Sequence, residues 1–132
     1  MLKLGLSGTA QLAVTNLVTA KSVGSGTLDV LATPVMLAQM EKAAWTCAAS
    51  HLANGESTVG TLLNVKHLNP TPLGQEVFCR AELTEIDGRR LVFWVTASDQ
   101  RGLVGEGVHE RFIVQEDKFM KKAVARNDSV EA

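Results

Sequence analysis

The sequence of 132 residues predicts an α+β domain in which one long helix packs on an antiparallel sheet, in the order β-α-β-β-β-β. One stretch repeats its apolar residues at steps of three and four, which is typical of a helix. Four later runs resemble strands, and turn signals such as Asp87-Gly88 separate them. Strands joined by such hairpins pair antiparallel, so the sheet is expected to be antiparallel.

Residues 9–19 are rich in Thr, Val and Leu, and they are predicted to form the first strand. A glycine-bearing turn at residues 23–26 follows. The short apolar run at residues 28–32 then leads into the helix.

The helix has clear start and stop signals. Thr33 is a good N-cap and Pro34 suits the first helical position, where its missing N–H costs nothing. Asn54-Gly55 is the predicted end, so the helix is about twenty residues long. Its small residues would let another backbone approach closely, as a helix wrapped by a sheet requires. The predicted buried positions are Met36, Met40, Ala43, Ala44, Cys47, Ala48 and His51.

Four strands are predicted after the helix, at residues 57–68, 74–86, 89–98 and 103–115. In the second of these, Val77, Cys79, Ala81 and Leu83 share one face. The third strand has a similar apolar face, formed by Leu91, Phe93, Val95 and Ala97. We expect one domain over residues 1–116 and a polar C-terminal tail over residues 117–132, forming a short helix or frayed.

Composition restricts the class of protein. With 45% apolar and 20% charged residues the chain is expected to be soluble and globular. A net charge of −1 argues against nucleic acid as a partner, and no apolar run approaches the ~20 residues that span a bilayer. Cys47 and Cys79 are expected to be buried free thiols. Because no secretion signal is evident, the expected compartment is the cytoplasm.

Two ionisable residues are candidates for chemistry. Glu41 shares a helical stripe with Leu37 and Ala44, where a carboxylate is costly if it is buried without a partner. The alternative is an exposed Glu beside Lys42. His67 lies on the apolar face of its strand, either as a satisfied core residue or as an acid–base group near neutral pH.

Other positions leave two interpretations open. Thr33 either only caps the helix or also serves a site at the helix start, where free N–H groups favour negative charge. Gly60, inside a strand, indicates either a bulge or a substrate carbonyl close to the backbone. Residues 109–111 form either a solvated edge or a place where Arg111 meets an anionic ligand. No metal-ligand spacing is present, so no metal or cofactor is expected.

Several segments together are similar to the fluoroacetyl-CoA thioesterase family of hotdog-fold proteins, over roughly residues 20–120. They are Ala32-Thr33-Pro34-Val35-Met36-Leu37-Ala38-Gln39-Met40-Glu41, Val59-Gly60-Thr61, Val65-Lys66-His67, Asp87-Gly88-Arg89-Arg90-Leu91 and Gly107-Val108-His109-Glu110-Arg111. The resemblance implies a long central helix wrapped by a curved antiparallel sheet, and a homodimer as the active unit. Pairing of dimers into a tetramer stays open.

The resemblance also implies a site. The family's catalytic Thr, Glu and His match Thr33, Glu41 and His67. Its glycine near the thioester matches Gly60, and its arginine near the ligand matches Arg111. The implied reaction is hydrolysis of an acyl-CoA thioester, with acyl-CoA as substrate. Glu41 either attacks the carbonyl or orients a water molecule.

The segment before the helix, residues 21–30, is short, glycine-flexible and free of aromatic residues, whereas the family's lid is longer and aromatic. The expected substrate is therefore a small or short-chain acyl-CoA, and fluoroacetyl selectivity is not expected. Two alternatives remain. One is a non-catalytic acyl-CoA-binding dimer. The other is an enoyl-CoA hydratase, which wants a closely spaced Asp–His pair, for which this chain offers only Asp29 and His51.

Simple geometry constrains the implied site. Thr33 and Glu41 are eight residues apart, which on one helix is about 12 Å along the axis. If both serve one site, either the helix starts late or the two residues come from different subunits of a two-fold dimer.

Overall fold

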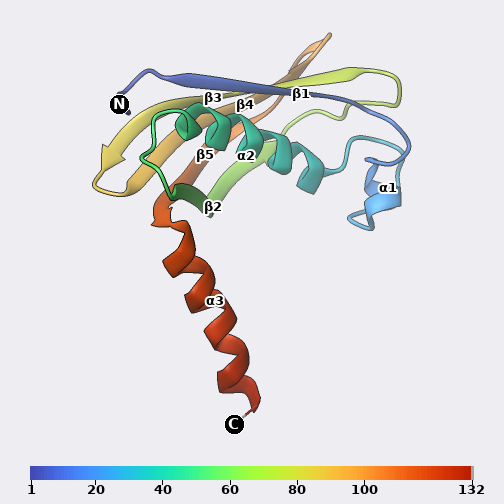
Figure 1. Cartoon of the computed structure of the whole chain (residues 1–132). Coiled ribbons are helices and arrows are strands. Elements are labelled where there is room, and N and C mark those ends of the chain that lie inside the picture. The colour runs from blue at the N-terminus through green and yellow to red at the C-terminus, as the bar shows by residue number, and fades with distance from the viewer. Residues whose placement is uncertain (132) are drawn as a thin grey trace.

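The strands form a single antiparallel sheet in the order β1-β3-β4-β5-β2, with β1 and β2 at its edges. The computed structural model describes residues 1–131, with side chains through residue 127. Its elements are β1 (Ser7–Ala13), α1 (Ala20–Val23), α2 (Thr33–Ala49), β2 (Glu56–His67), β3 (Glu76–Asp87), β4 (Arg90–Asp99), β5 (Gly102–Gln115) and α3 (Glu116–Glu131). The predicted α+β class, the long helix and the antiparallel sheet are confirmed (Figure 1).

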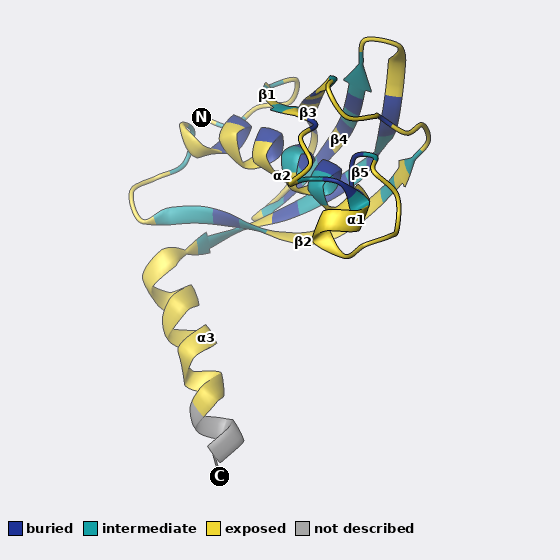
Figure 2. Ribbon diagram, turned by 90° about the vertical axis from the view of Figure 1, so that its right-hand side faces the viewer, coloured by how far each residue is buried: buried dark blue, intermediate teal, exposed yellow. Residues whose placement is uncertain are grey.

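The core lies between α2 and one face of the sheet (Figures 1 and 2). The predicted inward faces of β3 and β4 are buried, and so are the predicted helix positions up to Ala48. Gly8 shows how close the layers come, because a Cβ there would collide with the carbonyl of Ala43 and lie 2.9 Å from the Cβ of Cys47. The small residues of α2 are therefore required by its packing on β1. Cys47 and Cys79 are buried free thiols, as predicted.

The first strand is shorter than predicted. It ends at Ala13, and the chain then turns, with the Thr15 hydroxyl accepting a bond from the N–H of Leu17. Thr19 caps α1 by accepting a bond from the N–H of Ser22 at 3.2 Å. Threonine hydroxyls that bond nearby backbone N–H groups favour turns and helix caps over a strand. These local bonds explain why the strand ends before Thr15.

The predicted capping role of Thr33 is wrong. The N-cap is Ala32, and its carbonyl accepts bonds from the N–H groups of Val35 and Met36 at 3.0 Å each. Thr33 is the first helical residue, and its hydroxyl is not used by the helix. The predicted end at Asn54-Gly55 is also wrong, because the helix ends at Ala49 and the following loop leaves His51 only half-buried.

Of the two alternatives for the C-terminal tail, the helix is confirmed, and at 16 residues it is longer than the short helix predicted. α3 follows β5 directly and projects away from the sheet (Figure 1), with its described side chains exposed (Figure 2). Residue 132 lies outside the described part. Among residues 1–131, no helix combines the length and apolar character needed to cross a membrane.

Candidate active site

Thr33 and His67 meet at the N-terminal end of α2. The Thr33 Oγ1 lies 2.7 Å from Nδ1 of His67, which is the last residue of β2. Because the helix satisfies its first N–H groups through Ala32, the Thr33 hydroxyl is free to bond the imidazole. The contact joins two of the three residues that the family resemblance implies to be catalytic.

The second ring nitrogen of His67, Nε2, is buried and meets no partner at full hydrogen-bonding distance among the described residues, although the nearby backbone of Asn69 acts to raise the pKa of the ring. Burial lowers the pKa of the imidazole below its usual value, which favours the neutral ring. A cavity of about 290 Å³ adjoins it, lined by Thr33, His67 and residues of the preceding segment such as Ala20 and Val30. This end of the molecule therefore holds a neutral imidazole beside an open space.

A second group of candidate residues, away from Thr33 and His67, contains Glu41 and Arg111. Nη1 of Arg111, on β5, donates to Oε2 of Glu41, on α2, at 3.0 Å. The guanidinium side chain is 7% exposed, whereas the carboxylate side chain is 37% exposed. The interpretation of Glu41 as a solvated residue beside Lys42 is therefore wrong: an internal cation holds its carboxylate, and one edge of it remains open.

Arg111 uses most of its donors inside the chain. Its Nε and Nη2 donate to Oγ1 and the carbonyl of Thr58, at 2.9 and 3.0 Å. Its Nη1 also lies 3.2 Å from Nε2 of His109. A guanidinium has five N–H groups, so one, on Nη2, remains without a partner among the described residues. Burial lowers the pKa of Arg111, and the bond to Glu41 opposes that shift.

Gly60 lies directly against this pair. A Cβ at Gly60 would sit 2.5 Å from Oε2 of Glu41 and 3.3 Å from Nη1 of Arg111, so a side chain there would displace the carboxylate. The pairing of β2 with β5 also shifts register between Gly60 and Leu62. The bulge interpretation of this glycine is confirmed. The approach of a substrate carbonyl to its backbone stays a prediction.

A second cavity of about 440 Å³ opens beside Arg111. Its walls come from the C-terminal half of α2, including Trp45 and Ala49, and from Thr58 on β2. The acidic residues Glu56 and Glu116 line it as well. Arg111 is therefore part of the wall of this cavity.

Within one chain the two halves are far apart. Thr33 and Glu41 both lie on α2, so about 12 Å separates them along its axis. Gly60 and His67 lie seven residues apart on β2, which corresponds to about 23 Å of extended strand. The helix does not start late, so Thr33 and Glu41 of one chain do not meet.

The sequence analysis did not predict the roles of His109 and Thr58, which both contact Arg111. Residues 109–111 do not form a solvated edge, because His109 and Arg111 are 0% and 6% exposed. Only Glu110 points outward, where it pairs with Arg90 at 2.8 Å. Thr58 carried no signal, because its contact depends on the register of β2 against β5. No cluster of three potential metal ligands occurs within residues 1–131.

Comparison with known proteins places the chain among thioesterases. Residues 14–117 match the family described as fluoroacetyl-CoA-specific thioesterase. A fluoroacetyl-CoA thioesterase of Streptantibioticus cattleyicolor is 39% identical over 94 residues, covering 71% of this chain and 68% of the relative.

Solved structures agree with the sequence match. The fluoroacetyl-CoA thioesterase FlK superposes with a TM-score of 0.89 at 31% identity, over 95% of this chain and 97% of that one. A thioesterase superfamily member from Thermus thermophilus superposes with a TM-score of 0.90 at 25% identity, over 98% and 96%. The hotdog fold implied by the resemblance is thereby confirmed.

Proposed function

Because the chain belongs to the family of fluoroacetyl-CoA-specific thioesterases and is a thioester hydrolase acting on acyl-CoA, we propose that its substrate is a small or short-chain acyl-CoA. The observation that carries this proposal is the pair of half-sites, Glu41 against Gly60 and Thr33 against His67. They supply a carboxylate and a neutral imidazole, the groups that thioester hydrolysis needs.

Glu41 is proposed as the group that acts on the thioester carbonyl. Its fixed Oε2 and its partly exposed carboxylate support either direct attack or the orientation of a water molecule. In the water route, the new C–O bond forms as the water proton passes to the carboxylate. Arg111 would hold the carboxylate in place, and its spare N–H would face the acyl group.

Backbone N–H groups are proposed to hold the oxyanion, either near Gly60 or at the start of α2. The lack of a side chain at Gly60 lets a carbonyl approach the backbone beside Glu41. The tetrahedral intermediate then collapses as the C–S bond breaks. In the water route, the proton that Glu41 has taken up would pass through Nε2 of His67 to the departing thiolate, so that Glu41 and His67 both return to their starting forms, while Thr33 fixes the ring by its contact with Nδ1.

A two-fold homodimer would unite the two halves. β2 is an edge strand, and Leu62 and Leu63 at its centre are 44% and 37% exposed. If two copies of β2 pair antiparallel about a point between Leu63 and Asn64, Gly60 of one protomer lies opposite the partner's His67. Each dimer would then hold two equivalent sites.

The acyl group is proposed to be small. The segment before α2 is a single short helix, α1, followed by Gly24 in the left-handed conformation, and Ala20, Ser25 and Val30 line the cavity near His67. This segment contains no aromatic residue that could enclose a fluorinated group. Solved complexes of the related FlK contain acetyl-CoA in one case, and fluoroacetate with CoA in another.

The hydratase alternative has less support. α2 contains neither Asp nor His, and His51 lies beyond its end. The non-catalytic acyl-CoA-binding alternative would use the same cavities, so a measurement of turnover distinguishes it from the proposed enzyme.

The test is a colorimetric thiol-release assay over acetyl-, fluoroacetyl-, butyryl- and octanoyl-CoA. We expect release with the short chains and its loss in Glu41→Ala and His67→Ala. Lys42→Gln, beside Glu41 on the exposed side of α2, serves as the matched control. Activity that survives both substitutions would refute the assignment. Tight binding without turnover would favour the non-catalytic dimer, and loss of enoyl absorbance without thiol release the hydratase.

A further inference from the structure

His109 is a buried titratable residue that the proposed mechanism does not use. It lies on β5 at 0% exposure, with its ring 6.3 Å from the ring of Phe93 on β4. A buried imidazole is costly unless its polar atoms are paired. Both of its ring nitrogens have partners.

These partners restrict the imidazole to one state. Nδ1 lies 2.8 Å from the carbonyl of Leu62, which can only accept, so Nδ1 carries the hydrogen. Nη1 of Arg111 can only donate, so Nε2, 3.2 Å away, must present its lone pair. His109 is therefore a neutral imidazole in the Nδ1–H form.

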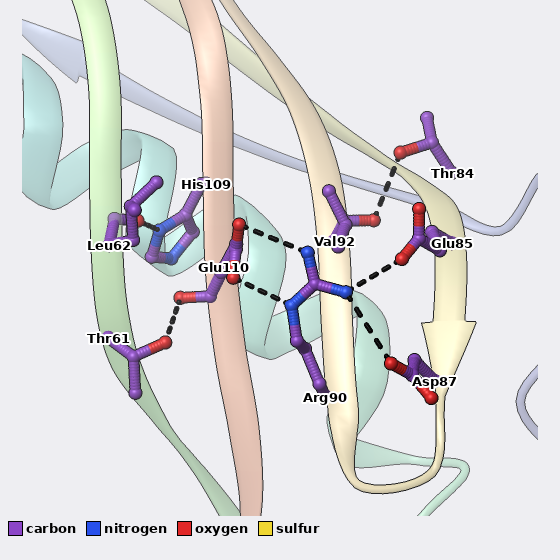
Figure 3. Close-up of polar contacts among 9 residues, drawn as sticks. All are labelled: Thr61, Leu62, Thr84, Glu85, Asp87, Arg90, Val92, His109 and Glu110. Carbon is purple, nitrogen blue, oxygen red and sulfur yellow. Dashed lines mark hydrogen bonds and ion pairs between the residues drawn. The ribbon is translucent and has the colours of Figure 1, made fainter.

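The two contacts join the β2 bulge to the arginine. Figure 3 shows the His109 side chain pointing toward Leu62, while Glu110 points the other way toward Arg90. The hydroxyl of Thr61 donates to the carbonyl of Glu110 at 3.2 Å, next to the register shift at Gly60 and Leu62. The bulge is thus bonded to β5 on both sides.

We propose that His109 is a positioning residue, which sets Arg111 against Glu41 and holds the bulge that places the Gly60 backbone. This rests on the proposed function, because Glu41 and Gly60 are the groups being positioned. His109 acts through them and touches no reacting atom. The lone pair at Nε2 and the N–H at Nδ1 are both needed, so the neutral form is the working form.

Protonation would undo this arrangement. An imidazolium would direct a second N–H at the Arg111 guanidinium, replacing a hydrogen bond by repulsion between like charges. Glu41 on α2 is the anion that faces this group, while Glu110 lies on the far face with Arg90. Leu62 on β2 and Phe93 on β4 add no charge. Burial lowers the pKa of His109, so the neutral form persists into mildly acidic solution.

The first test needs no variant. Long-range ¹H–¹⁵N correlation NMR of the imidazole rings in the wild-type protein is expected to show His109 as the Nδ1–H tautomer at neutral pH. An Nε2–H or cationic ring would overturn the proposal. Because the readout does not depend on turnover, it stays separate from the proposed function, which fails if the wild type releases no thiol from any acyl-CoA.

The second test compares kcat in two variants. His109→Phe keeps the ring packing and loses both bonds, and kcat is expected to fall about a hundredfold with KM little changed. His109→Asn retains a donor for Leu62 and should recover part of that loss, with an acid limb of the kcat–pH profile shallower than in the wild type. Val77→Ala, a buried substitution on β3, should lower stability and leave kcat unchanged.

Two outcomes of this comparison would overturn the proposal. One is a kcat of His109→Phe within about twofold of the wild type, which is less than any positioning effect. The other is a loss of kcat in Val77→Ala equal to that in His109→Phe, because the effect would then follow stability alone. If His109→Phe does not fold, the NMR measurement and His109→Asn decide.

Discussion

Nη1 of Arg111 lies 3.0 Å from Oε2 of Glu41, and this contact ties the last strand to the central helix across 70 residues of sequence. The cation is buried and the anion is partly open to solvent. A buried guanidinium without its carboxylate has lost its charge partner, so we expect both stability and activity to depend on this contact.

Replacing Glu41 separates these two effects. Glu41→Gln keeps an acceptor for Arg111 and removes the charge, so kcat should fall about 10²- to 10⁴-fold with a small change in stability. Glu41→Ala should also lower the free energy of unfolding by about 1–3 kcal/mol, because a buried donor is left unpaired. Thiol release and urea unfolding measure the two quantities. If Glu41→Gln and Glu41→Ala were equally stable, the Glu41–Arg111 contact would not contribute to stability in this way.

The Thr33 hydroxyl should matter more than the Thr33 methyl group. Thr33→Val removes the bond to Nδ1 of His67, and kcat should fall about tenfold, the value of one hydrogen bond of roughly 1.4 kcal/mol. Thr33→Ser should retain most of the activity. If Thr33→Ser is as impaired as Thr33→Val, the hydroxyl is not the active feature.

Mixing two inactive variants should restore activity. If Glu41 and His67 of one site come from different protomers, a heterodimer of Glu41→Gln and His67→Ala chains has one site with both native residues. Random reassociation of equal amounts should then give roughly a quarter of wild-type activity, since half of the dimers are mixed and each has one intact site. The measurement is thiol release after denaturing and refolding the mixture together. Activity no higher than that of the separate variants would place both residues in one protomer's site.

Gly60→Ala should impair catalysis through Glu41. The added Cβ would stand 2.5 Å from Oε2, so the carboxylate must move. We expect kcat to fall about a hundredfold, as for a displacement of about 1 Å at a reacting group. Ser57→Ala, on the same strand, is the control. A crystal structure of Gly60→Ala with Glu41 unmoved and full activity would rule out this explanation.

Stability should fall on mild acidification. Burial lowers the pKa of His109 from its ordinary 6.5 in the folded protein, so the unfolded chain takes up the proton first. The stabilisation is complete above about pH 6.5 and declines toward the folded pKa, by up to about 1.4 kcal/mol per pH unit. His67 acts in the same direction. Urea unfolding of the wild type and His109→Asn between pH 7.5 and 5 should give a shallower decline in the variant. Identical slopes would show that His109 does not titrate in this way.

The periodic elements could be predicted from sequence because packing repeats a local pattern. The buried faces of β3 and β4 follow alternation, and the buried positions of α2 up to Ala48 follow helical spacing. The ends were less predictable. Thr33 matched the capping pattern, yet its hydroxyl bonds His67, a partner 34 residues away that no local rule includes.

The pairing inside the site depends on register. Glu41 reaches Arg111 only because the β2 bulge and the rotation of α2 bring them to Gly60. Sequence alone therefore left Glu41 open between solvated and catalytic, and it could not foresee His109 as the partner of Arg111. The resemblance to a family supplied candidate residues but not the contacts that hold them.

The edge position of β2 has a consequence for aggregation of the protein. An edge strand with two exposed leucines near its centre is a template for adding further strands. In the proposed homodimer, a copy without its partner would be inactive as a catalyst and prone to aggregate. The same contact between copies would then complete the site and cover this edge.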